Sequence, residues 1–194
     1  MLLAENPRQL NMPRPFAEIE DYRTSHKNKG GSYDETILSS PFDAYMDTWE
    51  AHHLERAVQR LFPASLPRYL DFACGTGRIT RRVEAMATES YGVDLSQTML
   101  DAARAKCCRT HFVCADLSKD SLQLGEFDLI TAFRFFGNAQ DELRDSAMAA
   151  IRRHLRLGGY LIINNHRNPR SMLAAWRRNT REMDLSYSKL KSLL

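Results

Sequence analysis

Short apolar stretches alternate with helix-type stretches along most of this chain, and no other sequence feature constrains the fold as much. Apolar runs of strand length predict strands at residues 68–73, 90–93, 110–114, 127–133 and 160–164. Apolar residues at three-to-four spacing predict helices at residues 40–62, 77–86, 96–107 and 141–155. This alternation is typical of an α/β protein. We therefore expect a doubly wound, mostly parallel sheet with helices on both faces.

The 194 residues divide into three parts by composition. Residues 1–32 are polar and broken by prolines, which predicts a mobile N-terminal arm. Residues 33–166 begin with a helical cap and then hold the alternating pattern. Residues 167–194 are predicted to form a basic helical tail. Residues 151–194 carry ten Lys or Arg but only two acids, although the whole chain has a formal net charge of only +3. Such a tail is compatible with an RNA partner or with a solvated helix face, and the acidic remainder favours the second.

Composition excludes several classes of protein. Hydrophobic residues make up 43% and charged residues 26%, as in ordinary globular proteins. No apolar run reaches the roughly 18 residues that a transmembrane helix needs, and the N-terminus lacks the basic start of a signal peptide. We therefore predict a cytoplasmic protein without membrane association. Neither the four cysteines nor the adjacent His52 and His53 have the spacing of a metal site, so no metal is expected.

The strongest local motif follows the first predicted strand, where residues 71–78 read DFACGTGR. Gly75 can adopt a positive φ and lets a ligand lie against the backbone, next to the free N–H groups of a helix N-terminus. Asp94 follows the second strand, where a carboxylate can accept both hydroxyls of a ribose. Asp116 follows the third strand and is placed to accept an adenine amine. Together these features predict an adenosine pocket, although an acid after a strand can also cap the next helix.

Two absences narrow the choice of ligand. A dinucleotide fingerprint G-x-G-x-x-G would place its third glycine at position 80, which is Thr80. The turn also lacks the G-x-x-x-x-G-K-[ST] loop of nucleoside triphosphatases. Both absences argue against a pyrophosphate and favour a different adenosine ligand.

At these residues the chain resembles the class I S-adenosylmethionine (SAM)-dependent methyltransferases, in the small-molecule branch that is similar to ubiquinone and menaquinone methyltransferases. The resemblance covers about residues 33–166 and rests on the motifs at 70–77, 127–130 and 157–163. It implies a Rossmann-like methyltransferase fold, SAM as cofactor and a small-molecule methyl acceptor. The cofactor-binding residues that it implies are Asp71, Ala73, Gly75, Gly77, Asp94, Leu95, Met99, Asp116, Leu117, Phe133 and Tyr33.

The resemblance also assigns roles within this set. Asp71 would order the turn near the methionine amino group, and Asp94 would take the ribose hydroxyls. Leu95 and Met99 would flank the adenine, and Phe133 would lie near the sulfonium.

The chain departs from the family at its C-terminal end. Family members usually complete the sheet with two more strands, whereas the residues that follow His166 have a helical pattern. We therefore expect a sheet that lacks the last two strands. Either the chain is a truncated form of a longer protein, or its tail or another subunit covers the fifth strand.

Methyl transfer from a sulfonium requires little of the protein beyond holding the acceptor in line. His166 is a candidate general base for an acceptor that must lose a proton, although a tail or solvent-exposed histidine is the simpler explanation and is favoured. Arg134 and Asn138 are candidates for orienting the acceptor. Three other functions compete: a non-catalytic or truncated SAM-binding protein, an RNA methyltransferase and an NAD-dependent oxidoreductase.

Overall fold

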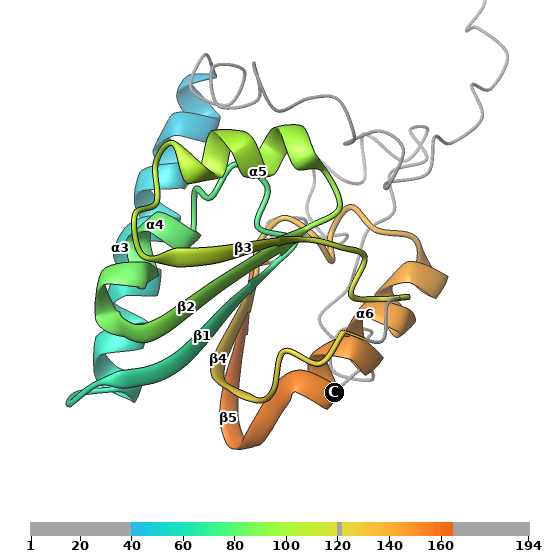
Figure 1. The fold of residues 1–194 in the computed structure, drawn as a ribbon. Coiled ribbons are helices and arrows are strands. Elements are labelled where there is room, and N and C mark those ends of the chain that lie inside the picture. The colour runs from blue at the N-terminus through green and yellow to red at the C-terminus, as the bar shows by residue number, and fades with distance from the viewer. Residues whose placement is uncertain (1–39, 120–121, 165–194) are drawn as a thin grey trace, which may run out of the picture.

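Five parallel strands form the centre of residues 40–119 and 122–164, the parts of the chain that a computed structural model describes (Figure 1). Their order across the sheet is β3-β2-β1-β4-β5, and every neighbouring pair is parallel. The strands are β1 (Leu66–Phe72), β2 (Ala87–Asp94), β3 (Thr110–Cys114), β4 (Phe127–Ala132) and β5 (Leu155–Ile163). The predicted parallel α/β architecture is therefore confirmed.

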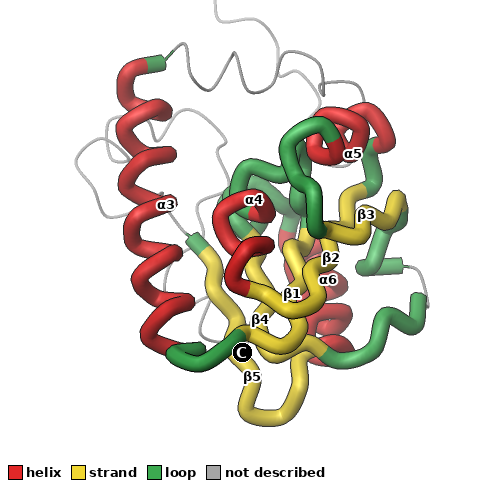
Figure 2. Tube along the Cα trace, turned by 60° about the vertical axis from the view of Figure 1, so that its left-hand side comes forward, coloured by secondary structure: helices red, strands yellow, loops and turns green. Residues whose placement is uncertain are grey.

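Helices cover both faces of this sheet (Figure 2). They are α3 (Pro41–Leu61), α4 (Thr80–Val83) with the 3-10 turn Glu84–Met86, α5 (Gln97–Arg104) and α6 (Asp141–His154). On one face, Leu54 of α3 and Val83 of α4 share an apolar cluster with Tyr69 of β1. On the other face, Ile151 of α6 packs in a second cluster with Leu70 of β1. Burial of these apolar side chains holds the two helix layers on the sheet.

The strand order places a topological switch beside β1. The chain builds outward from β1 to β2 and β3, and then returns to place β4 and β5 on the other side of β1. In open α/β sheets of this kind, ligands bind in the crevice at the carboxyl ends of the strands, where the order reverses. The residues that follow β1, β2, β3 and β4 meet at this edge.

Two predicted elements differ clearly from the structure, whereas the bounds of the others agree within three residues. The predicted helix 77–86 is a turn followed by the short α4 and a 3-10 turn. The predicted strand 160–164 begins earlier, at Leu155, because Leu155 already pairs with Phe127 of β4. The register then shifts before Tyr160 pairs with Leu129, so Gly158 and Gly159 lie inside β5 rather than before it.

The predicted N-terminal arm 1–32, Tyr33, His166 and the tail 167–194 lie outside the described residues. Within residues 40–119 and 122–164, the helices are too short or too polar to span a bilayer.

Candidate functional site

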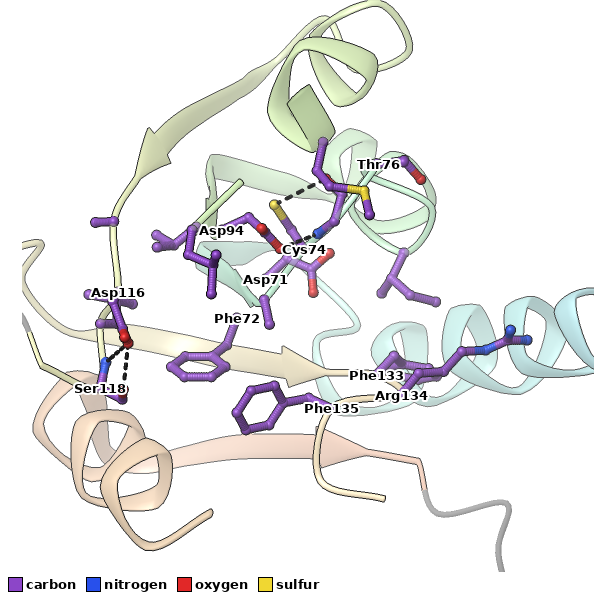
Figure 3. A pocket seen from close by; sticks show the side chains of 18 of the residues that line it. Asp71, Phe72, Cys74, Thr76, Asp94, Asp116, Ser118, Phe133, Arg134 and Phe135 are labelled. Atoms are coloured by element: carbon purple, nitrogen blue, oxygen red, sulfur yellow. Dashed lines mark hydrogen bonds between the residues drawn. The ribbon is translucent and has the colours of Figure 1, made fainter. Parts of the chain in front are cut away.

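One cavity lies at the carboxyl ends of β1, β2, β3 and β4 (Figure 3). The space that these strand ends enclose, including the part that is open to solvent, has a volume of about 960 Å³. Nine of the residues predicted to bind a cofactor line it: Asp71, Ala73, Gly75, Asp94, Leu95, Met99, Asp116, Leu117 and Phe133. Segments far apart in the sequence thus meet around one site.

The turn after β1 exposes its backbone to this cavity. Gly75 has a φ of +54°, and a Cβ built there would meet no atom within 4 Å, so open space lies beside the peptide. Ala73 also has a positive φ, 55°, which is unusual for a residue with a side chain. Strained backbone of this kind concentrates at functional sites, where the surrounding structure holds it in place.

Gly77 differs from Gly75 in its surroundings. Its φ is +73°, and an added Cβ would lie 3.0 Å from both Ala103 Cβ of α5 and Cys107 Sγ. Gly77 is not among the lining residues. The structure therefore gives it a packing role between the turn and α5, and a cofactor contact stays a prediction.

Asp94 joins two backbone segments at the edge of the cavity. Its Oδ2 accepts a hydrogen bond from the N–H of Gly75 at 2.9 Å, and its Oδ1 accepts one from the N–H of Ser96 at 2.9 Å. The N-cap of α5 is Ser96, whose hydroxyl accepts from the N–H of Met99. Helix capping therefore does not explain Asp94, and its carboxylate lies between the glycine turn and the end of β2.

Asp116 lies two residues beyond the end of β3. Its Oδ1 accepts from the N–H of Ser118 at 3.1 Å and also from the Ser118 hydroxyl. Both residues line the cavity. The short Asp116–Ser118 turn thereby fixes the orientation of the carboxylate beside the apolar wall that Leu117 contributes.

Asp71 lies beneath the turn, in a buried hydrogen-bond network. Its carboxylate accepts from the Thr80 hydroxyl at 2.6 Å and from the Thr131 hydroxyl at 2.8 Å. The Tyr69 hydroxyl in turn lies 2.7 Å from that of Thr131. Burial raises the pKa of Asp71 to about 6, although both threonine bonds act in the opposite direction.

Several lining residues were not predicted as cofactor contacts: Phe72, Arg78, Ile79, Val93, Ala115, Ser118, Arg134, Phe135 and Leu143. Most neighbour a predicted residue in sequence, so the motif itself could have indicated them. Leu143 is on α6, and no local pattern connects it to the turn. Arg134, expected to orient an acceptor, does line the cavity; it has a φ of +56°. Asn138 instead donates to the Arg134 carbonyl at 2.5 Å.

Comparisons with known proteins find similar sequences and structures among methyltransferases. Residues 70–159 match the family model described as a methyltransferase domain. A demethylmenaquinone methyltransferase of Tropheryma whipplei is 30% identical over 152 residues, which are 76% of this chain and 59% of that protein. The chain thus spans about three fifths of the length of this relative.

Two solved structures share both the fold and part of the sequence. An S-adenosylmethionine-dependent methyltransferase from Clostridium acetobutylicum is 27% identical, with a TM-score of 0.55, over 68% of this chain and 56% of its own. A SAM-bound amino pentose methyltransferase from Micromonospora echinaspora is 25% identical, with a TM-score of 0.53, over 62% of this chain and 53% of its own. Residues 70–159 of this chain therefore match a methyltransferase domain, and the described residues share the fold of solved SAM-dependent methyltransferases.

Proposed function

We propose that this chain binds SAM in the cavity at the carboxyl ends of its strands and transfers the methyl group to a small-molecule acceptor. The observation that carries the proposal is the set of three aspartates, Asp71, Asp94 and Asp116, that the fold brings to one cavity beside the exposed backbone of Gly75. The relatives support both parts of it. One is named for a quinone acceptor and one for an amino sugar, and the latter was solved with SAM bound.

The residues present fit this cofactor by the chemistry of their side chains. SAM offers hydrogen-bond donors at three places, namely the methionine ammonium, the ribose hydroxyls and the adenine amine. Carboxylates accept hydrogen bonds and favour cations. Asp94 would accept from the ribose hydroxyls and Asp116 from the adenine amine, while the apolar side chains of Leu95 and Met99 would contact the adenine ring.

SAM supplies an activated methyl group on a cationic sulfur when it is bound. The contribution of this chain is to hold SAM and to orient the methyl acceptor. The backbone of Ala73 to Thr76 would contact the methionine part, and Phe133 and Phe135, which also line the cavity, would exclude water at the end of β4. Arg134 is placed to orient an acceptor, and His166 stays a candidate base. Proximity and exclusion of water would account for most of the rate acceleration.

Thermal unfolding of the full chain with SAM, S-adenosylhomocysteine (SAH) or NAD tests the binding step. Ligand at about 100 times its Kd adds roughly 2.7 kcal/mol to the free energy of unfolding. We expect SAM and SAH, but not NAD, to raise the midpoint, and Asp94→Ala to abolish the rise. Asp101→Ala is the matched control, since Asp101 is an exposed acid that bonds Gln97 and Arg104 away from the cavity. A rise with NAD alone would refute the proposal.

Methyl transfer needs a separate assay, because the chain covers only part of the length of its relatives. Methyl-labelled SAM is incubated with the protein and with small-molecule, RNA and protein fractions of a cell extract. We expect label in the small-molecule fraction. Label only in RNA would establish the competing RNA methyltransferase, and SAM binding without transfer would establish a non-catalytic SAM-binding protein. The cytoplasmic location inferred from the sequence is part of the proposal and is tested by fractionation.

A further inference from the structure

Helix α3 carries a buried carboxylate outside the cavity, and this carboxylate touches three segments that form or support the cavity. Glu50 is only 3% exposed. Its Oε2 lies 2.9 Å from Nη1 of Arg78, and its Oε1 accepts a 2.5 Å hydrogen bond from Nδ2 of Asn164. The guanidinium of Arg134 lies 3.6 Å from Oε2.

Each of these partners follows the carboxyl end of a different strand. Arg78 ends the glycine turn after β1, Arg134 lies in the loop after β4, and Asn164 directly follows β5. Arg78 and Arg134 both line the cavity. One side chain of α3 therefore connects all three segments.

Glu50 supports the loop after β4 in two ways. The first is the ion pair with the Arg134 guanidinium. The second passes through Asn164, whose Oδ1 accepts the backbone N–H of Arg134 at 2.5 Å while its Nδ2 donates to Glu50. Arg134 has a left-handed backbone, with a φ of +56°. Such a conformation persists where neighbouring groups determine it, and the Glu50–Asn164 contact supplies such a restraint.

Two other acids on the same face of α3 complete the cluster. Asp47 pairs with Arg78 at 2.5 Å, and Asp43 lies 3.6 Å from Arg134. Buried ion pairs add little net stability, because each charge must first lose its water. An apolar face would hold α3 on the sheet equally well, as Leu54 does further along the helix. The charged half of α3 is therefore better suited to fixing the positions of the two arginines than to adding stability.

We propose that Glu50 is a positioning residue of the cofactor cavity, which sets the geometry of the glycine turn through Arg78 and that of the loop after β4 through Asn164. This inference rests on the proposed function, since it assumes that SAM and SAH bind in the cavity. Without Glu50, the turn and the loop after β4 lose a shared anchor, and a ligand must order both as it binds. Binding weakens when this ordering cost is added.

The test compares Glu50→Gln with Glu55→Gln by calorimetric titration of SAH into the full chain. Glu50→Gln removes the negative charge without changing the side-chain volume, and it leaves one acceptor oxygen for two donors, so the new NH2 group must face either Arg78 or Asn164. We expect the Kd for SAH to rise about tenfold or more, as misplaced site groups cause. Glu55 is on the same helix, does not line the cavity, and lies 3.7 Å from Arg82. Its substitution should change Kd by less than twofold.

Asn164→Ala provides a second, milder variant in case Glu50→Gln does not fold. It removes the link between Glu50 and the Arg134 backbone and leaves the pair of Glu50 with Arg78 in place, and we expect a Kd several-fold above that of the wild type. The proposal also predicts that the double variant of Glu50→Gln and Arg78→Met loses less affinity than the product of the two single losses, because both changes act on the same turn and Glu50 adds only its route through Asn164.

The outcomes separate the two proposals. If the wild-type chain does not bind SAH, the proposed function fails. If the wild type binds SAH and the folded Glu50→Gln and Asn164→Ala variants bind it equally well with only a lower unfolding midpoint, Glu50 is merely structural and the positioning role is refuted. Losses from Glu50→Gln and Arg78→Met that multiply fully would also refute it.

Discussion

At the scale of single residues, Asp71 connects the strand to the turn above it. It is 1% exposed, and both hydroxyls that contact its carboxylate donate to it. Since Thr131 donates to Asp71, its oxygen must accept from the Tyr69 hydroxyl. Both donations hold together only while the carboxylate is ionised, because a protonated oxygen would donate to the threonine that it faces.

Asp71 should make the stability of the chain depend on pH. Its pKa rises from 3.8 to about 6 on folding, chiefly because burial removes water from the carboxylate. The folded state therefore holds the proton more tightly, and the contribution of Asp71 to stability is fully present below about pH 4 and is lost between about pH 4 and 6. The size of this loss is about 3 kcal/mol. Asp71→Asn should remove this pH dependence.

Urea unfolding of wild type and Asp71→Asn at pH 4, 5, 6 and 7 measures this effect. The difference in free energy of unfolding between the two proteins should shift by about 3 kcal/mol in favour of the variant as the pH rises. The cost of turning one threonine hydroxyl toward the amide is the same at every pH, so it does not contribute to the shift. Parallel curves for the two proteins would contradict the raised pKa.

The sequence predicted Asp71 but not its partners. Asp71 is found because it begins a motif of eight consecutive residues. Thr80 and Thr131 are found only when α4 packs beside β1 and β4 pairs with it, which places Asp71 opposite Thr131 in the sheet. The role of Glu50 could not be predicted from the sequence for the same reason, since its partners Arg78 and Asn164 contact it only in the folded chain.

At the scale of elements, two glycines of the turn after β1 have different surroundings although only one residue lies between them. Gly75 borders the cavity, whereas Gly77 packs against α5. An added Cβ at Gly75 meets open space beside the cavity, whereas one at Gly77 meets Ala103 and Cys107 at 3.0 Å. Both positions have a positive φ, so either alanine costs about 1–2 kcal/mol in backbone strain. Gly77→Ala should add the cost of overpacking against α5, typically 1–3 kcal/mol.

Urea unfolding and SAH titration of the two variants together test this separation. We expect Gly77→Ala to be the less stable protein. Gly75→Ala should instead be the weaker binder, because its methyl group occupies space that a ligand would fill. Equal losses of affinity in the two variants would indicate that the turn responds as one rigid unit.

Helix α6 is held to the loop after β4 by Arg144, which is 2% exposed. Its Nε–H donates to the Phe136 carbonyl at 2.8 Å, and its Nη1 donates to Asp141 at 2.8 Å. Arg144→Met keeps the apolar stem and leaves one carbonyl without its donor, which costs about 1–3 kcal/mol. Arg144→Lys keeps a buried charge that cannot reach both acceptors, which costs about 3–5 kcal/mol. Urea unfolding should therefore find the lysine variant less stable, and the reverse order would contradict the planar two-acceptor arrangement.

Element types were predictable here, but some boundaries were not. Strands β1 to β4 are short apolar runs between turn residues, so pattern alone locates them. Leu155 fits the apolar period of α6 equally well, and only its pairing with Phe127 assigns it to β5. A pair of glycines often follows the end of a helix. Here Gly158 and Gly159 instead allow the irregular start of β5, where Gly158 has a φ of +81°.

At the scale of the whole molecule, every described residue that lines the cavity lies between Asp71 and Leu143. Helix α3 adds the Glu50 anchor from outside, and β5 adds Asn164. Residues 40–164 thus contain the described cavity together with its supports. The sequence-based domain bounds of 33–166, which also include Tyr33 and His166, are slightly wider.

A fragment of residues 40–164 should therefore bind SAH with a Kd within about threefold of the full chain, a difference below 1 kcal/mol. Calorimetric titration of both proteins measures this, after circular dichroism has established that the fragment is folded. Asp94→Ala, made in both, serves as the control that binding occurs in the same cavity. If the folded fragment loses tenfold or more, residues outside 40–164 complete the site. Tyr33→Ala in the full chain would then identify the predicted contact, because it alone should reproduce that loss.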